Sequence, residues 1–561
     1  MKIVSITLFI FWVFISCGLG QGAEVGVEFI LDTSAPTQTL PSLFSVNLNL
    51  AGGRENDPTW PSGLAEDRAL EKLEKDLGFL GLFRLKWDFW QIGQLEKDKE
   101  KQKQLIENYE AVIKKISDRG GTVILTLINT PPGLGRTLDK RSCPENFSKW
   151  KELVKDTIKI LSCDKKYNLW YELWDDPTNE EVFLGTQKDY LNLYHALSRA
   201  VAELEKQYNI NIPVGGPGVS NWYDNFDGNS PLTPERSLIY DLMRFCSQNN
   251  LPLDFISWHA YSTQTDLERQ NIAYNRNLTS LIREWMGYFG FKEKINLVVT
   301  EWNWGFDSVK ILDERSGQAY TCASFILARL KNFYTAALDK AIFYTLQDAA
   351  DAKGNLLNNC GLMHANFASD RESPSLKATY WLYRYLGLLG DSWYPHFTSG
   401  DAFVDGLATK KGDDLILLFW HYVDPFLLRN TIENAYLNFT GREQDLLTKI
   451  IKSNHLKDIL NKTGQPAELN ESERLRNFLK DLTNFYYQAR ESQQKDSSIS
   501  LKIKNIRGRF KYICYVLDEN SAASALTPVK EEKKILTGDF QENIILRPYS
   551  VALVVLHKIS D

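Results

Sequence analysis

Short apolar segments alternate with amphipathic segments from about residue 42 to residue 390, and this alternation constrains the fold most strongly. The short segments, rich in Val, Ile, Leu and aromatic residues, predict eight β-strands: 43–49, 81–87, 122–128, 168–174, 212–216, 253–259, 296–301 and 341–346. Apolar residues at helical spacing predict the intervening helices: 64–77, 103–117, 150–161, 189–207, 237–249, 278–289, 318–339 and 376–389. Eight strand–helix units predict an α/β fold, a closed (β/α)8 TIM barrel. A doubly wound open sheet is the alternative.

After residue 390 the pattern changes to strands alone. Strands are expected in an accessory C-terminal β-sandwich domain: 415–420, 500–503, 509–517, 543–546 and 551–556. A charged helical segment at 444–491 is expected as an insertion, and the N-terminal strand 25–31 is expected to join the sandwich. The predicted domains are therefore a barrel at 32–389 and a β-sandwich at 390–561.

The first 22 residues have the order of a secretory signal peptide. Lys2 precedes an apolar run at 3–15, and small residues follow it. Cys17 lies in a segment that loosely resembles a bacterial lipoprotein cleavage site, so a lipid anchor at Cys17 is one alternative and an uncleaved membrane anchor is another. We therefore expect a secreted or extracytoplasmic protein that meets a membrane only through such an anchor.

Charge and motif content exclude several functional classes. The chain has 65 Lys and Arg against 71 Asp and Glu, a net charge of −6, with no basic stripe that could bind nucleic acid. The seven cysteines and seven histidines show no CxxC, HxH or HExxH spacing, and dinucleotide, P-loop and serine-hydrolase motifs are missing. The sequence therefore predicts no cofactor and no resident metal.

Polar and aromatic residues gather where the predicted strands end. The fourth strand ends in Tyr171-Glu172-Leu173-Trp174-Asp175-Asp176-Pro177, the sixth in His259-Ala260-Tyr261 and the seventh in Glu301-Trp302-Asn303. In a TIM barrel these ends meet at the catalytic face. Two carboxyl groups facing each other there, one protonated and one ionised, are what glycoside hydrolysis requires.

These motifs resemble glycoside hydrolase family 39, which includes β-xylosidases and α-L-iduronidase. The strand-four run resembles the family's aromatic-Glu-apolar-Trp-Asn-Glu-Pro signature, and Thr300-Glu301-Trp302-Asn303 resembles its nucleophile strand. Downstream, Gly215-Gly216-Pro217 and a strand with His259 and Tyr261 also match. The resemblance covers about residues 25–390 and implies retaining hydrolysis of xyloside- or uronide-type glycans.

The sequence departs from the family pattern at three positions. Asp175 and Asp176 replace the Asn-Glu pair, so the expected acid/base is one methylene shorter, and Lys86 stands where the family commonly has His. Lys86 could bind a sugar carboxylate or pair with Asp175. Because of the altered pair, a pseudoenzyme that binds carbohydrate without cleaving it is the alternative function.

The resemblance assigns roles to the strand-end residues. Glu301 is the expected nucleophile and Asp176 the expected acid/base, although each could instead be structural, as a buried ion pair or a turn carboxylate. The expected substrate contacts are Lys86, Asp175, His259, Tyr261, Trp302 and Asn303. Glu172 is expected to be a buried structural carboxylate. A hard cation held by Asp175, Asp176 and Glu301 is a further alternative.

Overall fold

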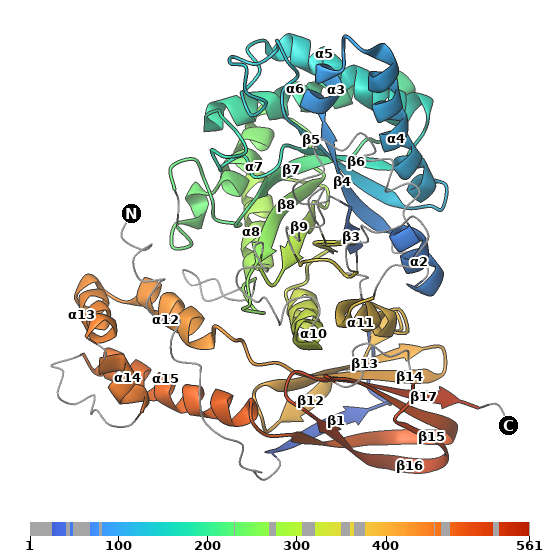
Figure 1. Cartoon of the computed structure of the whole chain (residues 1–561), viewed down its shortest axis with the longest axis vertical. Coiled ribbons are helices and arrows are strands. Elements are labelled where there is room, and N and C mark those ends of the chain that lie inside the picture. Colours follow the sequence, from blue (N-terminus) through green and yellow to red (C-terminus); the bar gives the residue numbers. More distant parts are fainter. Residues whose placement is uncertain are drawn as a thin grey trace.

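The computed structural model describes two parts, a barrel surrounded by helices and a broad β-sheet beneath it (Figure 1). The described residues are 25–40, 45–48, 68–77, 81–228, 230–268, 277–305, 320–348, 359–363, 376–453, 455–461, 472–519 and 527–559. The predicted signal peptide at 1–22, with Cys17, lies outside them. Among the described helices, none has the length and apolarity needed to cross a membrane.

Eight parallel strands close the barrel in the order β10-β3-β4-β5-β6-β7-β8-β9. Their bounds are β3 (Ser45–Asn47), β4 (Leu82–Asp88), β5 (Thr122–Ile128), β6 (Leu169–Leu173), β7 (Val214–Val219), β8 (Phe255–Tyr261), β9 (Asn296–Asn303) and β10 (Lys340–Phe343). Consecutive strands are neighbours, and β10 returns to β3 through the pair Phe343–Val46. The predicted closed barrel is confirmed, and the open-sheet alternative is wrong.

Helices follow the strands and form the outer ring of the barrel (Figure 1). Their bounds are α2 (Arg68–Leu77), α3 (Phe89–Gln94), α4 (Lys99–Ser117), α5 (Phe147–Ile158), α6 (Gln187–Tyr208), α7 (Leu238–Asn249), α8 (Leu278–Phe289), α10 (Tyr320–Thr335) and α11 (Ala378–Leu386). Polar side chains fix several helix starts. At α6, Thr186 and Asp189 exchange side-chain hydrogen bonds with each other's backbone N–H.

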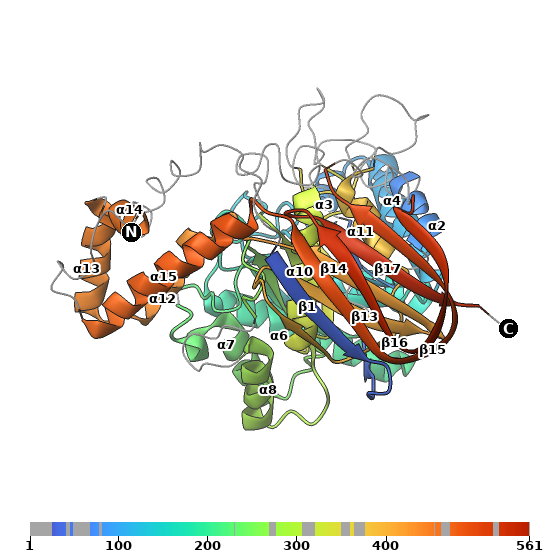
Figure 2. The ribbon, with the colours of Figure 1, turned by 90° about the horizontal axis from the view of Figure 1, so that it is seen from below.

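The accessory domain is a nine-stranded sheet seen from below the barrel in Figure 2. Its strands are β1 (Val25–Asp32), β2 (Gln38–Thr39), β11 (Ser392–Trp393), β12 (His396–Ser399), β13 (Val404–Lys411), β14 (Asp414–His421), β15 (Ser497–Leu517), β16 (Lys530–Leu546) and β17 (Val551–Lys558). The sheet folds over its own apolar core, where Phe29 of β1 meets Phe419 of β14 edge to face at 4.9 Å. The accessory β-sandwich fold predicted from the sequence is confirmed.

The N-terminal strand β1 belongs to this sheet and not to the barrel. It pairs parallel to β15 along its whole length and antiparallel to β12. The chain therefore begins its described part in the accessory domain, crosses into the barrel, and returns to the same sheet after α11.

Between β14 and β15, the described residues form four inserted helices, which project to one side of the sheet (Figure 2). They are α12 (Leu427–Asn438), α13 (Gly441–Lys452), α14 (His455–Leu460) and α15 (Glu473–Ser492), and they have an apolar core of their own. The insertion begins at Leu427, earlier than the predicted 444. Asn430 of α12 donates to Thr263, which follows β8, so the insertion contacts the barrel at the carboxyl ends of its strands.

Residues 500–503 and 509–517 form one strand, β15, although two were predicted. A register shift between Ile503 and Ile506 interrupts its pairing with β16. Asn505, within the shifted stretch, has a φ of 61°, a conformation that carries the chain through this bulge without ending the strand. The gap between the two predicted strands thus contains a bulge.

Candidate active site

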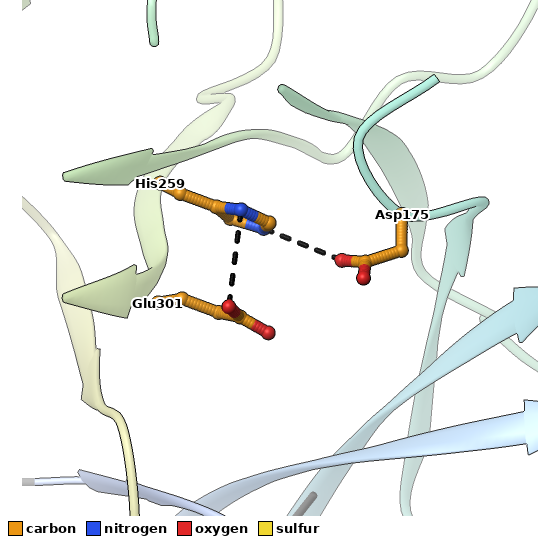
Figure 3. Close-up of side chains that lie close together, drawn as sticks. All are labelled: Asp175, His259 and Glu301. Atoms are coloured by element: carbon orange, nitrogen blue, oxygen red, sulfur yellow. Dashed lines mark ion pairs between the residues drawn. The ribbon is translucent and has the colours of Figure 1, made fainter. Parts of the chain in front are cut away.

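Asp175, His259 and Glu301 meet at the carboxyl ends of the barrel strands (Figure 3). Asp175 follows β6, His259 lies in β8 and Glu301 lies in β9. His259 stands between the two acids: its Nε2 is 3.4 Å from Asp175 Oδ1 and its Nδ1 is 3.9 Å from Glu301 Oε2. The fold thus unites side chains that are up to 126 positions apart in the sequence.

A sharp turn after β6 separates the two adjacent aspartates. Trp174 and Asp176 both adopt positive φ, 60° and 43°, which is uncommon for residues other than glycine. Backbone hydrogen bonds hold the turn, since Trp174 N–H donates to Leu127 O and Asp176 N–H donates to Gly218 O. The turn places Asp175 in the cluster with His259 and sends the Asp176 side chain to the loop after β7.

The Asp176 carboxylate is occupied by donors from two loops. Ser220, which follows β7, donates to it through Oγ at 2.7 Å and through the backbone N–H at 3.2 Å. Asn179 Nδ2 and Thr178 Oγ1 add contacts at 3.2 and 3.4 Å. Asp176 therefore lies at the same end of the barrel as Glu301, but its hydrogen-bond partners are different. These partners also fit the alternative prediction, in which Asp176 is a structural turn carboxylate.

Arg84 of β4 lies beneath the cluster and binds three carboxylates. Its guanidinium contacts Glu172, Asp175 and Glu301, with the Asp175 contact at 2.7 Å. The Arg84 side chain is fully buried, so water cannot replace any of these partners. Burial by itself would lower the pKa of Arg84, but the three carboxylates raise it well above its usual value. Arg84 is a permanent buried cation.

Glu172 has the structural environment expected from the sequence. It is fully buried, and its Oε2 accepts hydrogen bonds from Arg84 Nε and Thr126 Oγ1, both at 2.8 Å. A carboxylate bound in this way orients the guanidinium that in turn contacts Asp175 and Glu301.

Lys86 pairs with Asp175, so two of the departures from the family pattern are in direct contact. Lys86 Nζ lies 2.6 Å from Asp175 Oδ2. Burial would raise the pKa of Asp175, but the charges of Lys86 and Arg84 and the contact with His259 hold it well below its usual value. Asp175 is therefore ionised over the whole range in which the protein is expected to work.

His259 is held toward its charged form by its neighbours. Burial would lower the pKa of His259, but the negative charge of Glu301 and the contact with Asp175 outweigh it and raise the pKa. With His259 protonated, three cations (Arg84, Lys86 and His259) face three carboxylates (Glu172, Asp175 and Glu301). The site is then close to electrical balance despite its burial.

Glu301 is oriented by donors at both carboxylate oxygens. Tyr261 donates its hydroxyl hydrogen to Oε2 at 2.7 Å, while Arg84 Nη1 and Asn47 Nδ2 donate to Oε1. Sequence reasoning missed Asn47, which ends β3 in Ser45-Val46-Asn47. An Asn at the end of the first barrel strand was the available signal, because every barrel strand ends at the same face.

Two predicted substrate contacts lie in structural positions. Trp302 is fully buried, with its ring 5.3 Å from Phe333 of α10 and 5.1 Å from Phe343 of β10. Successive strand residues alternate between faces, so Glu301 faces inward and Trp302 packs against the helices, which contradicts its predicted substrate contact. Asn303 donates its amide to the backbone carbonyls of Tyr344 and Cys360, so its donors hold two loops together and the prediction of a sugar contact is not supported.

The predicted cation site has the wrong electrostatic setting. Ligand atoms of Asp175, His259 and Glu301 lie within 4.8 Å of one another, as a metal site would need. Arg84 and Lys86, however, already contact these carboxylates and would repel a divalent ion. Asp176, the third ligand of that alternative, binds Ser220 instead.

Comparison with known proteins identifies related sequences. The family model for glycosyl hydrolases family 39 matches residues 139–416. A β-xylosidase from Geobacillus stearothermophilus is 21% identical over 297 residues, 50% of this chain and 53% of the relative. A second β-xylosidase, from Caldicellulosiruptor saccharolyticus, is 23% identical over 353 residues, 59% of this chain and 65% of the relative. The chain thus spans about half to two thirds of the length of these curated relatives.

Solved structures share the fold over nearly the whole chain. A monomeric β-xylosidase from Caulobacter crescentus CB15 superposes with a TM-score of 0.62 at 14% identity, covering 95% of this chain and 100% of the other. A family 39 enzyme from Xanthomonas axonopodis pv. citri gives a TM-score of 0.60 at 16% identity, covering 96% and 98%. The barrel and the accessory sheet therefore occur together in these proteins as they do here. With the family match at residues 139–416, these findings show that the chain belongs to glycoside hydrolase family 39.

Proposed function

We propose that the protein is a retaining glycoside hydrolase that cleaves the O-glycosidic bond of β-xylosides. Glu301 is the nucleophile. The observation that carries the proposal is the position of this carboxylate, held by Arg84, Tyr261 and Asn47 at the catalytic end of the barrel. A carboxylate that accepts several hydrogen bonds is held in one orientation, as a nucleophile must be to attack the anomeric carbon.

The reaction has two steps. In the first, a Glu301 oxygen bonds to the anomeric carbon while an acid protonates the departing oxygen. In the second, water attacks the same carbon, the bond to Glu301 breaks, and the former acid accepts the proton of the water. Arg84 and Tyr261 bind the Glu301 carboxylate in the free enzyme and remain beside it when it is regenerated.

A xyloside suits the site better than a uronide. The uronide proposal needs Lys86 to bind a sugar carboxylate, but Lys86 lies 2.6 Å from Asp175. A sugar carboxylate would have to compete with that ion pair and would bring another negative charge next to Asp175 and Glu301. The two related sequences are both β-xylosidases, which supports the same choice.

Trapping the covalent intermediate tests the proposal. We expect 2,4-dinitrophenyl 2-deoxy-2-fluoro-β-xyloside to release one equivalent of dinitrophenol and to label Glu301, as located by peptide mass spectrometry. The fluorine slows both steps, and the good leaving group lets the first proceed, so the intermediate accumulates. Glu301→Gln should prevent labelling, whereas Glu293→Gln, a change of an exposed residue outside the site, should not.

The same experiment separates the enzyme from the pseudoenzyme alternative. A carbohydrate-binding pseudoenzyme would release no dinitrophenol from the activated xyloside but would still bind xylose or xylobiose in calorimetry. Release of dinitrophenol with the corresponding iduronide, but not with the xyloside, would leave the nucleophile in place and refute the choice of sugar.

We also propose that the protein is exported through its N-terminal segment. The support is the sequence of residues 1–22, with Lys2 before the apolar run and small residues after it. Expression in a bacterial host followed by mass spectrometry of the N-terminus tests this. Cleavage near residue 22 indicates secretion, and a lipid-modified N-terminal Cys17 indicates anchoring.

A further inference from the structure

The first step of the proposed reaction needs a protonated carboxyl, and the two adjacent aspartates are poor candidates. Asp175 lies near enough to Glu301, since ligand atoms of the two residues are within 4.8 Å. Its ion pairs with Lys86 and Arg84, however, keep Asp175 ionised. Asp176 accepts hydrogen bonds on both oxygens from Ser220, Asn179 and Thr178, so neither of its oxygens is left without a donor.

A third carboxyl, Asp224, lies at the same end of the barrel in the loop that follows β7. This loop starts at Ser220, the residue that binds Asp176. The loop is held in place, because Leu238 N–H donates to Asp224 O at 2.8 Å and the side chain of Trp222 is buried. Asp224 therefore belongs to an anchored loop whose first residue, Ser220, binds Asp176.

The two oxygens of Asp224 have different surroundings. Oδ2 accepts hydrogen bonds from the backbone N–H of Asn221 at 2.9 Å and from Asn221 Nδ2 at 3.2 Å. Within the described part of the chain, no residue donates a hydrogen bond to Oδ1. One oxygen thus fixes the carboxyl, and the other remains available to carry a proton to a substrate.

Charge and burial favour a protonated Asp224. Burial raises the pKa of Asp224 to about 6 although the Asn221 bonds act against it, and the negative charge of Asp176 adds to the increase. The charge of His259 acts on the same carboxyl in the opposite direction. A carboxyl whose pKa is raised in this way can both give and take a proton, as an acid that must also act as a base requires.

We propose that Asp224 is the proton donor and acceptor of the hydrolysis that we have proposed for this protein. In the first step the proton on Asp224 moves to the glycosidic oxygen, the bond from that oxygen to the anomeric carbon breaks, and Glu301 bonds to the carbon. In the second step the Asp224 carboxylate takes a proton from water, whose oxygen bonds to the anomeric carbon as the bond to Glu301 breaks. Asp176 positions the loop through Ser220.

Substrates with poor and good leaving groups test this assignment, with Asp224→Asn compared with Asp176→Asn. We expect Asp224→Asn to lower kcat/KM on xylobiose by about 10²–10⁴-fold. On 2,4-dinitrophenyl β-xyloside the same change should have little effect on glycosylation, because that leaving group departs without a proton. The Asn side chain keeps an oxygen to accept the Asn221 N–H, so the loop is retained.

Azide gives a second readout that a structural role would not produce. Without its base, the Asp224→Asn enzyme should release the covalent intermediate slowly, and added azide should accelerate turnover and yield a xylosyl azide. The fall of kcat/KM at alkaline pH should also disappear in this variant. Asp227→Asn, a change of an exposed residue in the same loop, is the matched control and should behave like the unmodified enzyme.

The outcomes distinguish this inference from the function on which it rests. Azide rescue and selective loss on xylobiose in Asp176→Asn, with Asp224→Asn active, would overturn the assignment of Asp224 while the glycosidase stands. An unmodified protein that neither releases dinitrophenol nor labels Glu301 would refute the proposed function, and the role of Asp224 with it.

Discussion

A group of His and acidic residues at the barrel and a group of His, Ser and Asp in the accessory domain have similar residue types, but only the first resembles a catalytic site. At the barrel, His259 lies between Asp175 and Glu301. In the accessory domain, His421 Nε2 contacts Ser492 Oγ at 2.7 Å, and Ser492 donates to Asp401 Oδ2 at 2.6 Å. The residue types are similar, but their surroundings differ.

The difference lies in charge and in unused bonding capacity. His421 Nδ1 accepts the backbone N–H of Tyr549, so Nε2 carries the proton and donates to Ser492, and both ring nitrogens are used. Burial lowers the pKa of His421 even with Asp401 nearby, whereas the pKa of His259 is raised. The accessory group is a hydrogen-bonded connection between α15 and the sheet, and its histidine is held in the neutral form. The charge state of the histidine and the number of ion pairs around it therefore distinguish the two groups, although their residue types are similar.

The largest expected effect on stability comes from removing the cation at the barrel site. Arg84→Met should lower the free energy of unfolding by about 3–5 kcal/mol, because Glu172, Asp175 and Glu301 would remain buried without their shared partner. Urea denaturation followed by tryptophan fluorescence measures this loss. Arg429→Met, in an exposed helix pair with Glu433, should cost under about 0.5 kcal/mol, and an equal loss in both variants would contradict the comparison.

Breaking the hydrogen bonds among His421, Ser492 and Asp401 should lower the free energy of unfolding by less, and it should leave the rate of hydrolysis unchanged. Ser492→Ala leaves the buried His421 Nε2 without its partner, at a cost of about 1–3 kcal/mol. We expect thermal unfolding at a lower temperature and unchanged kcat/KM on 2,4-dinitrophenyl β-xyloside. Ser498→Ala, a change of a partly exposed serine in β15, is the matched control. A loss of hydrolysis in Ser492→Ala would mean that the two groups are not independent.

The two histidines should titrate in opposite directions from the usual value of about 6.5. NMR of ring-labelled histidine should give a higher pKa for His259 and a lower one for His421, assigned with His259→Gln and His421→Gln. Folded His259 binds more protons than the unfolded chain above pH 6.5, so its contribution to stability falls as the pH rises through its folded pKa. For His421 stability falls as the pH drops below about 6.5, because the unfolded chain binds the proton more tightly. Equal pKa values would remove the distinction between the two groups.

The smallest expected effect concerns the charge of Lys86, whose side chain is partly exposed. Lys86→Met should lower the free energy of unfolding at neutral pH by about 1 kcal/mol or less. Because Lys86 helps to depress the pKa of Asp175, stability should begin to fall at a higher pH on acidification than in the unmodified protein. Acid titrations monitored by circular dichroism test this shift, with the surface change Lys151→Met as control. An unchanged acid midpoint would show that Arg84 and His259 are sufficient for Asp175.

The repeating pattern of the sequence predicted the barrel well but described the accessory domain less completely. Buried parallel strands such as 122–128 are continuous apolar runs, which periodicity detects reliably. Strand β16 was predicted only at 543–546, because its first part, 530–542, is dominated by Lys and Glu on a strand that pairs with β15 alone. Charges on an edge strand protect it from aggregation and conceal it from a hydrophobicity analysis.

Within the site, sequence predicted the carboxylates but not their orientation. Glu301, His259 and Tyr261 lie together because strand ends share a face. Asp175 and Asp176 point to different partners because Trp174 and Asp176 have positive φ, and this conformation could not be predicted from the residue types. Asp224 was not considered, since a loop carboxylate gains significance only from the burial and neighbours that the folded chain provides.

The position of β1 has a consequence for biogenesis. Thr33, just beyond this strand, donates to Lys504 O, a residue 471 positions later in the chain. Strand β1 can pair with β12 once residue 399 has emerged from the ribosome or the export channel, but it cannot complete its pairing with β15 until residue 504 has emerged. A product truncated before β15 would therefore leave β1 with an open edge for chaperones and proteases to recognise.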